Sequence, residues 1–253
     1  MKPLLRLAAL FFLFMTACDN TPQYDGLEDY PVYEASDLGF SYDKAATTFK
    51  MWSPAAQEVK LNIYASGNGD NLQSSFQMKR GNQGEWSFKL TGDQRNKYYT
   101  YQVRQNGAWL QEKPDLYAVA VGVNGQRSMI VELDETDPVG WQNDSRPALE
   151  NYTDIILYEL HIRDMSIHET SGAKNKGKYL ALTEEGTKSP NGLTTGLDHI
   201  KELGVTHVHL LPTFDHKSID ETRLEEAQYN WGYDPLNYNV PEGSFSTDPF
   251  DGR

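Results

Sequence analysis

The sequence predicts two folds in succession: an all-β sandwich, followed by the first part of an α/β barrel of the (β/α)₈ type that is incomplete. Across residues 37–137, short runs of alternating apolar and polar residues are separated by turns. Across residues 138–253, the runs are continuously apolar, with a helical pattern between them. Alternation is typical of half-buried strands, and continuous apolar runs are typical of parallel strands covered on both faces.

The composition is that of a globular protein with an excess of acid. The 253 residues include 36 acidic and 23 basic ones, giving a formal charge of −13, and 38% are hydrophobic. This is enough apolar material for one large or two medium domains with real cores. An acidic chain without a long basic run repels phosphate backbones, so we expect no nucleic-acid partner.

The first 17 residues have the pattern of an export signal. Lys2 and Arg6 precede an apolar run, residues 7–15, and small residues lead to Cys18, the only cysteine. The run is shorter than the roughly 20 residues that span a bilayer. A cysteine directly after "MTA" resembles the lipobox of bacterial lipoproteins, in which lipid is attached to the cysteine; the alternative is an ordinary secretory signal with a chance cysteine.

We therefore expect an exported, membrane-anchored lipoprotein, periplasmic or on the cell surface, whose Cys18 inserts its lipid into the bilayer. With at most one thiol, the chain holds no internal disulfide. We expect residues 18–36 to form a tether, because residues 19–30 are polar and acidic.

The sandwich is predicted from about seven strand-like runs. Residues 58–65, "EVKLNIYA", and residues 84–90, "GEWSFKL", alternate in polarity, and Asn106 and Gly107 supply a hairpin turn. Runs at this spacing predict a β-sandwich of about 100 residues.

Three tryptophans fall within the predicted sandwich. Trp86 and Trp109 could form an external carbohydrate platform, but alternating tryptophans in a sandwich are more often core residues. We expect both to be core residues and Trp52 to be structural.

Two strands and a helix are predicted in the second region. Residues 154–162, "DIILYELHI", and residues 205–214, "VTHVHLLPTF", read as strands buried on both faces. Between them, residues 194–204, "TTGLDHIKELG", place apolar residues at helical spacing, with Thr194 or Thr195 as the cap and Gly204 as the stop. The order strand, helix, strand predicts a βαβ unit.

A complete (β/α)₈ barrel needs eight strands and about 250 residues, whereas only about 100 residues follow the sandwich. We interpret the chain, which ends in "DPFDGR", as a fragment or truncated gene product cut early in a barrel. An intact small domain of another kind is the alternative.

Residues 229–239, "YNWGYDPLNYN", combine four aromatic rings with short amides and an aspartate. Proline and several asparagines predict a loop rather than a regular helix or strand. The rings could fill a local core, or they could stack on sugar rings while the amides bind hydroxyl groups. The stretch begins about 20 residues beyond Leu211, where the loops after barrel strands carry functional residues, which favours the sugar site.

Several polar residues receive structural interpretations. We expect Glu159, His161 and Arg163 to form a buried network at a strand end. His207 and His209 share one face of a strand, and without a third ligand we expect a satisfied interior pair rather than a metal site.

No metal-binding motif is recognised, and we expect no cofactor. Four loop acids could hold a structural calcium, but their spacing fits no calcium loop, so a solvated loop is favoured. These acids are Asp215, Asp220, Glu225 and Glu226.

Six stretches, taken in order, resemble the type I pullulanases of glycoside hydrolase family thirteen, which debranch starch. They are "FKMWSP", "AVAVGVNGQRSMIVEL", "YELHIRD", "GKYLALTEEGTKSPNG", "GVTHVHLLPTFD" and "YNWGYDPLNYNVPEGSFSTDP". The resemblance implies that the sandwich is a family forty-eight carbohydrate-binding module and that the partner is an α-glucan such as pullulan, amylopectin or glycogen.

The resemblance also implies site residues. The tyrosine of the "GY" pair, Tyr233, stacks on a sugar, and Asn230, Trp231 and Asp234 line the same region; Asp234 could instead cap the turn before Pro235. The implied reaction is retaining hydrolysis of α-1,6-glucosidic linkages by a nucleophilic aspartate and an acid/base glutamate. The family carries both on later barrel strands, beyond Arg253, so we name no catalytic residue and expect the fragment to be inactive.

Two other functions remain open at this point. One is a non-catalytic starch-binding surface lipoprotein, and the other is an isoamylase-like or branching-enzyme relative with the same module.

Overall fold

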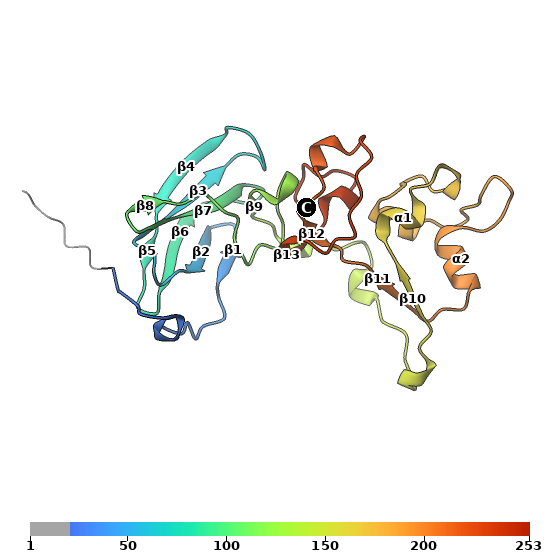
Figure 1. Cartoon of the computed structure of the whole chain (residues 1–253), viewed down its shortest axis with the longest axis horizontal. Coiled ribbons are helices and arrows are strands. Elements are labelled where there is room, and N and C mark those ends of the chain that lie inside the picture. Colours follow the sequence, from blue (N-terminus) through green and yellow to red (C-terminus); the bar gives the residue numbers. More distant parts are fainter. Residues whose placement is uncertain (1–20) are drawn as a thin grey trace, which may run out of the picture.

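The computed structural model describes residues 21–253, which form an elongated molecule of three parts (Figure 1). A β-sandwich lies at one end, a parallel strand pair with two α-helices lies at the other, and the C-terminal segment lies between them. The predicted signal and the lipidation site Cys18 fall outside the described residues. Within residues 21–253, none of the helices has the length and apolar character needed to cross a bilayer.

Two antiparallel sheets build the sandwich. The strand order of one is β1 (Gly39–Tyr42), β2 (Ala46–Trp52), β6 (Glu85–Thr91) and β5 (Lys79–Arg80). The other contains β4 (Leu72–Gln77), β3 (Glu58–Tyr64), β7 (Tyr98–Gln105) and β8 (Ala108–Trp109), with β9 (Ser128–Met129) also paired to β7. The predicted all-β domain is confirmed.

The sandwich core forms where the two sheets face each other. Phe49 on β2 and Trp86 on β6 pack with Leu61 on β3 and Tyr99 on β7, and all four are buried. The rings of Phe49 and Tyr99 meet edge to face, with their centroids 5.0 Å apart. The alternating residues of these strands therefore point inward, as their period of two predicts.

The other two tryptophans lie outside this core. Trp109 is half-buried, and the Nζ of Lys60 lies 4.1 Å from its ring centroid; its predicted core position is wrong because β8 is a two-residue edge strand. The Nε1 of Trp52 donates to the carbonyl of Gln83 at 2.9 Å, which supports a structural role.

The second region contains the predicted strand, helix, strand order. Strand β10 (Leu157–Leu160) pairs in parallel with β11 (His207–Leu210), and between them lie α1 (Ile162–Ser166) and α2 (Gly196–Glu202). Thr195 stands at the N-cap of α2, but its hydroxyl donates to the carbonyl of Ser171 rather than capping the helix. Gly204 follows the helix with a φ of +71°, so the predicted stop is confirmed.

The predicted burial of these two strands is wrong. Leu157 is 59% exposed, Val208 is 43% exposed, and every residue of β11 is exposed. A sheet of two strands offers too little surface to cover its own faces. α2 shields only one end, where Ile200 packs against Leu160, Ile162 and Phe245.

The predicted interior histidine pair is wrong for the same reason. His207 and His209 lie on the exposed strand β11. The Nδ1 of His209 lies 3.3 Å from a carboxylate oxygen of Glu159 across the strand pair, and both side chains are more than half exposed.

The C-terminal segment forms an antiparallel pair, β12 (Phe214–His216) with β13 (Pro235–Pro241), with irregular register. This corrects the expectation that residues 229–239 form no strand. Pro235 and Pro241 are the terminal residues of β13 in a two-stranded sheet, where a missing backbone donor is tolerated.

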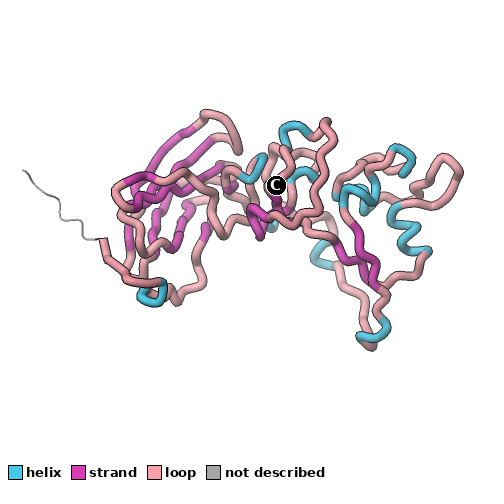
Figure 2. Tube along the Cα trace, in the orientation of Figure 1, coloured by secondary structure: helices cyan, strands magenta, loops and turns pink. Residues whose placement is uncertain are grey.

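Short 3₁₀ helices lie in the connecting loops, which make up much of the second half of the chain (Figure 2). They are η1 (Leu27–Asp29), η2 (Val123–Gly125), η3 (Leu133–Glu135), η4 (Trp141–Asn143), η5 (Tyr152–Asp154), η6 (Glu169–Ser171), η7 (Tyr179–Thr183), η8 (Glu221–Arg223) and η9 (Gly243–Phe245).

Candidate carbohydrate-binding surface

The aromatic residues predicted to meet a sugar lie in and just after the loop that joins β12 to β13. Tyr229, Trp231, Tyr233 and Tyr238 are 54%, 60%, 67% and 70% exposed. A set of rings that filled a local core would be buried, so the local-core interpretation is wrong. Exposed rings of this kind mark a surface that can bind a partner.

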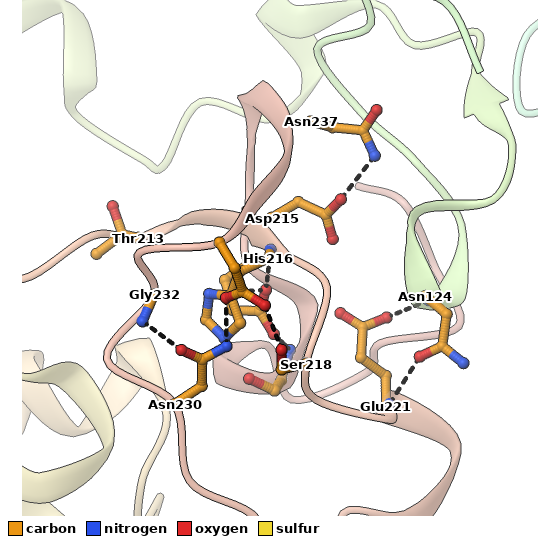
Figure 3. Close-up of polar contacts among 12 residues, drawn as sticks. Asn124, Thr213, Asp215, His216, Ser218, Glu221, Asn230, Gly232 and Asn237 are labelled. Atoms are coloured by element: carbon orange, nitrogen blue, oxygen red, sulfur yellow. Dashed lines mark hydrogen bonds and ion pairs between the residues drawn. The ribbon is translucent and has the colours of Figure 1, made fainter. Parts of the chain in front are cut away.

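Side chains within the loop hold its shape. The Oδ1 of Asn230 accepts from the backbone N–H of Gly232 at 2.9 Å, and its Nδ2 donates to Asp234 at 2.5 Å. The other carboxylate oxygen of Asp234 accepts from the hydroxyl of Ser218. Figure 3 shows the contact between Asn230 and Gly232 as a dashed line. Asn230 and Asp234 thus have partners inside the protein, and we interpret their first role as positioning Trp231 and Tyr233.

Gly232 makes the turn between these two aromatic residues. Its φ is +89°, and a Cβ added there would lie 2.8 Å from the carbonyl oxygen of Pro212. Both the left-handed backbone and the close approach require glycine. The turn therefore fixes where the flanking Trp231 and Tyr233 leave the main chain.

His161 ties the loop to the end of β10. It is 5% exposed, its Nε2 lies 2.9 Å from the carbonyl oxygen of Asn230, and its ring centroid is 5.6 Å from that of Tyr229. The predicted structural role of His161 is confirmed. Glu159 is exposed, so its predicted place in a buried network is wrong. Arg163 is half-buried and contacts Asp164, whose carboxylate also lies 3.8 Å from the Nδ1 of His161.

The charge of Asp234 is set by opposing effects. Partial burial raises the pKa of its carboxyl, but hydrogen bonds from Ser218 and Asn230 oppose this, and the net result is a pKa below the usual value. Asp234 is therefore a carboxylate at neutral pH, and its charge strengthens both hydrogen bonds.

A shallow, open hollow of about 500 Å³ lies on the β12–β13 pair beside Tyr238. The ring centroids of Phe214 and Tyr238 are 5.5 Å apart, and Tyr179 lines the hollow from η7. Neither Phe214 nor Tyr179 was identified from the sequence as a site residue, because the pairing of β12 with β13 is what brings them beside Tyr238.

The four loop acids do not form a calcium loop. Asp220 caps η8 through Thr222 and pairs with Arg223, and Glu225 and Glu226 are exposed. Asp215 is buried rather than solvated, at 1% exposure. It lies instead in the one group of potential metal ligands found within residues 21–253, together with Glu221 and Glu242.

This buried group is unsuited to cleaving a polysaccharide. Asp215, Glu221 and Glu242 are at most 5% exposed. Retaining glycosidases place their two carboxyl groups on either side of a bound sugar. Carboxylates that a sugar cannot reach do not meet that requirement, so we assign them no catalytic role.

Comparison with known families identifies the sandwich. The family described as "Carbohydrate-binding module 48 (Isoamylase N-terminal domain)" matches residues 37–118. These residues contain β1 to β8, so the all-β domain is similar to this module.

Longer matches extend into the second region. The pullulanase of Bacillus subtilis is 40% identical over 88% of this chain and 30% of its own length. Pullulanase 1 of Arabidopsis thaliana is 32% identical over 84% of this chain and 25% of its own length. A crystal structure of the Paenibacillus barengoltzii pullulanase with maltohexaose and α-cyclodextrin is 50% identical, with a TM-score of 0.86, over 89% of this chain and 35% of that one. The chain thus spans about a third of these relatives or less.

Proposed function

Because the chain belongs to the type I pullulanase family and matches its N-terminal region, we propose that the intact protein is a debranching glycoside hydrolase. Its substrates are α-glucans such as pullulan, amylopectin and glycogen, and it cleaves α-1,6-glucosidic linkages with retention. The pullulanases of Bacillus subtilis and Arabidopsis thaliana are 40% and 32% identical to this chain, whereas isoamylase SU1 of Zea mays is 24% identical, which favours this function over an isoamylase or branching enzyme.

The observation that carries the proposal is the exposed, braced aromatic loop. Tyr233 offers its ring face to the apolar face of a glucose unit, and Trp231 flanks it. Asn230 and Asp234 hold the loop through their internal hydrogen bonds and line the same region. A binding surface whose backbone is already fixed loses less conformational entropy when a sugar binds.

Catalysis belongs to a different part of the intact protein in this proposal. Strands β10 and β11 are the first two of a (β/α)₈ barrel, and the nucleophile and the acid/base lie on later strands beyond Arg253. The greater length of the relatives supports this arrangement. The 253-residue chain by itself then binds glucan without cleaving it.

The proposed location is extracytoplasmic, with a lipid anchor on Cys18. Its support is the signal pattern of residues 1–17 and the cysteine that follows. A Cys18→Ser variant that stayed in the membrane fraction would argue against the anchor.

The test of the glucan site is Tyr233→Ala in the intact enzyme. Loss of a central aromatic contact is expected to lower kcat/KM on pullulan by about tenfold or more. Tyr152→Ala is the matched control, because Tyr152 is 88% exposed on η5 and should leave the rate unchanged. Circular dichroism verifies that both variants are folded.

Two results would contradict the proposal in different ways. Full activity of Tyr233→Ala would remove the stacking role while leaving the enzyme assignment intact. An intact protein that binds pullulan but releases no reducing ends would instead be the non-catalytic starch-binding lipoprotein.

A further inference from the structure

A small pocket rich in basic side chains lies beside the aromatic loop, with Asn230 in its wall. Its volume is about 180 Å³, and five basic residues line it: His161, Arg163, Lys176, Lys178 and His216. We call it the basic pocket. The acid among its described lining residues is Glu226, which is exposed and pairs with Arg223. Such a concentration of basic groups runs against the formal charge of −13 of the whole chain.

The basic residues reach the pocket from separate segments. Arg163 lies on α1, His216 lies on β12, and the two lysines lie in the loop before η7. Gly177 stands between the lysines with a φ of +74°, and its backbone N–H donates to the hydroxyl of Ser166 at 2.8 Å. This left-handed turn, which glycine adopts without strain, fixes both lysines where they line the same pocket.

Neither lysine forms an ion pair within residues 21–253. The Nζ of Lys176 donates to the carbonyl of Glu169 at 2.8 Å, and the Nζ of Lys178 donates to the carbonyl of Ser244 at 2.7 Å. An ammonium group carries three donors, so each lysine keeps two beyond this bond. Two positive charges that no carboxylate contacts make the pocket attractive to an anion.

Arg163 adds donors of a different geometry. Its half-buried guanidinium contacts the carboxylate of Asp164 at 3.4 Å, which uses one of its five N–H groups. The planar fork of an arginine can donate to two oxygens of one phosphate group at once.

His216 provides an independent sign of a missing partner. Its side chain is 1% exposed, and neither ring nitrogen makes a hydrogen bond within the part of the chain that the structure describes, although Nδ1 lies 3.3 Å from the Oε2 of Glu242. His161 in the same wall differs, because its Nε2 contacts the carbonyl of Asn230 and its Nδ1 accepts from the N–H of Asp164. Buried polar groups in native proteins are rarely left without a partner.

We propose that the basic pocket binds a tetrahedral oxyanion, of which phosphate is the representative. Its oxygens point in several directions and can accept from donors on separate segments. A phosphoryl group carries about −1.5 to −2 charges at pH 7, which the positive charges of Arg163, Lys176 and Lys178 offset. The pocket is several times larger than the roughly 30 Å³ that one water molecule occupies in the liquid, so it has room for such a group.

The environment of Lys178 fits this assignment. Partial burial lowers the pKa of its ammonium group, and the opposing influence of Glu221 and Glu242 does not cancel this effect. A bound oxyanion would favour the charged form of Lys178 and offset the cost of its burial.

The position of the pocket allows two sources of the oxyanion. Asn230 lines the pocket, and its side chain accepts from the N–H of Gly232 in the turn between Trp231 and Tyr233 (Figure 3). The oxyanion can be free phosphate or sulfate, or it can be a phosphate ester on a glucan whose sugar rings contact the aromatic loop. The second source rests on the proposed glucan site, whereas the first does not.

Calorimetric titration of the 253-residue chain with sodium phosphate is the first test. In HEPES buffer, with the ionic strength held constant by NaCl, we expect one saturable site per chain and competition by sulfate. Phosphate should also raise the melting temperature more than NaCl of the same ionic strength does. A titration without a saturable phosphate site would overturn the proposal, and equal binding of chloride would overturn the oxyanion assignment.

Variants locate the site. Lys176→Met and Lys178→Met each remove a charged donor and should weaken phosphate binding by about tenfold or more. Lys174→Met is the matched control, because Lys174 is an exposed lysine of the same loop that does not line the pocket. Unchanged binding in both pocket variants, or an equal loss in the control, would overturn the location. The wild-type titration decides the proposal even if a variant fails to fold.

Phosphorylated amylopectin, compared with the same polymer after phosphatase treatment, distinguishes the two sources. If the pocket takes a phosphate ester, the chain binds the phosphorylated polymer more tightly, and Lys178→Met removes that preference. Equal affinity for the two polymers, together with a saturable phosphate site, assigns the pocket to a free anion. Tyr233→Ala separates this site from the proposed glucan site. It should weaken the binding of both polymers and leave inorganic phosphate binding unchanged, because Tyr233 does not line the pocket.

Discussion

The β-sandwich and the parallel pair β10–β11 place leucines in opposite environments. Leu61 on β3 is fully buried between two sheets, whereas Leu157 on β10 is 59% exposed. Both lie in strands with full backbone pairing to a neighbour. The sandwich supplies a facing sheet for its apolar residues, and the parallel pair does not.

This difference shows what an apolar pattern encodes. The continuous run in residues 154–162 predicts a strand that is covered on both faces, and the described residues provide one neighbouring strand and two short helices. The apolar pattern thus predicts more covering structure than these residues provide. In our proposal, the missing cover is the remainder of the barrel.

The largest effect expected from this comparison is the contrast between Leu61→Ala and Leu157→Ala. Removing the buried side chain leaves a cavity and should lower the free energy of unfolding by about 2–5 kcal/mol. Removing the exposed side chain should change it by less than about 0.5 kcal/mol. Urea denaturation followed by tryptophan fluorescence and circular dichroism measures both.

A large cost for Leu157→Ala would break the comparison. It would mean that the parallel pair is covered in solution, for example by a second copy of the chain. Repeating the denaturation at several protein concentrations separates these cases, because self-association makes stability concentration-dependent.

A smaller effect is expected from two glycines, one in each region. Gly107 in the β7–β8 hairpin and Gly232 in the aromatic loop both have positive φ, but only at Gly232 would a Cβ meet backbone atoms. Gly107→Ala should therefore cost about 1–2 kcal/mol from the left-handed conformation alone. Gly232→Ala should lower the free energy of unfolding by more than Gly107→Ala does, and it should also weaken pullulan binding. Equal losses of stability for the two variants would show that Pro212 can move away from the added Cβ.

Much of the fold could be predicted because its signals are local. Alternation in residues 58–65 predicts β3, and the Asn106–Gly107 turn forms with positive φ at both residues. Local patterns were insufficient where context decides the outcome. Trp109 lies on an edge strand too short to bury it, and Pro235 starts a strand that its composition argued against.

The site divides in the same way. The exposed rings of Trp231 and Tyr233 lie in the one stretch where the sequence predicted them. The buried carboxylates of Asp215, Glu221 and Glu242 could not be predicted as a group, since they come from separate segments of the chain and meet only after β12 pairs with β13. Asp215 was read as one of several solvated loop acids because nothing near it in the sequence signals burial.

The smallest effect is a pair of pH dependences with opposite sign. Burial raises the pKa of Asp115 in the sandwich above 3.8, despite hydrogen bonds from the N–H of Tyr117 and the hydroxyls of Tyr99 and Tyr101. The folded sandwich therefore binds more protons than the unfolded chain, and stability falls as the pH rises from 3.8 through the folded pKa.

Asp234 in the aromatic loop should behave in the opposite way. Its folded pKa lies below 3.8, so its contribution is present above that pH and is lost as the pH falls through the folded pKa. The free energy of unfolding of Asp115→Asn should fall less than that of the wild type as the pH rises above 3.8, and that of Asp234→Asn should fall less as the pH drops below 3.8. Urea denaturation between about pH 3 and 7 measures both. The stability difference between wild type and variant should change with pH in opposite directions for the two substitutions. If it changed in the same direction, one of the two carboxyl groups would not have the burial or hydrogen bonds that the structure shows.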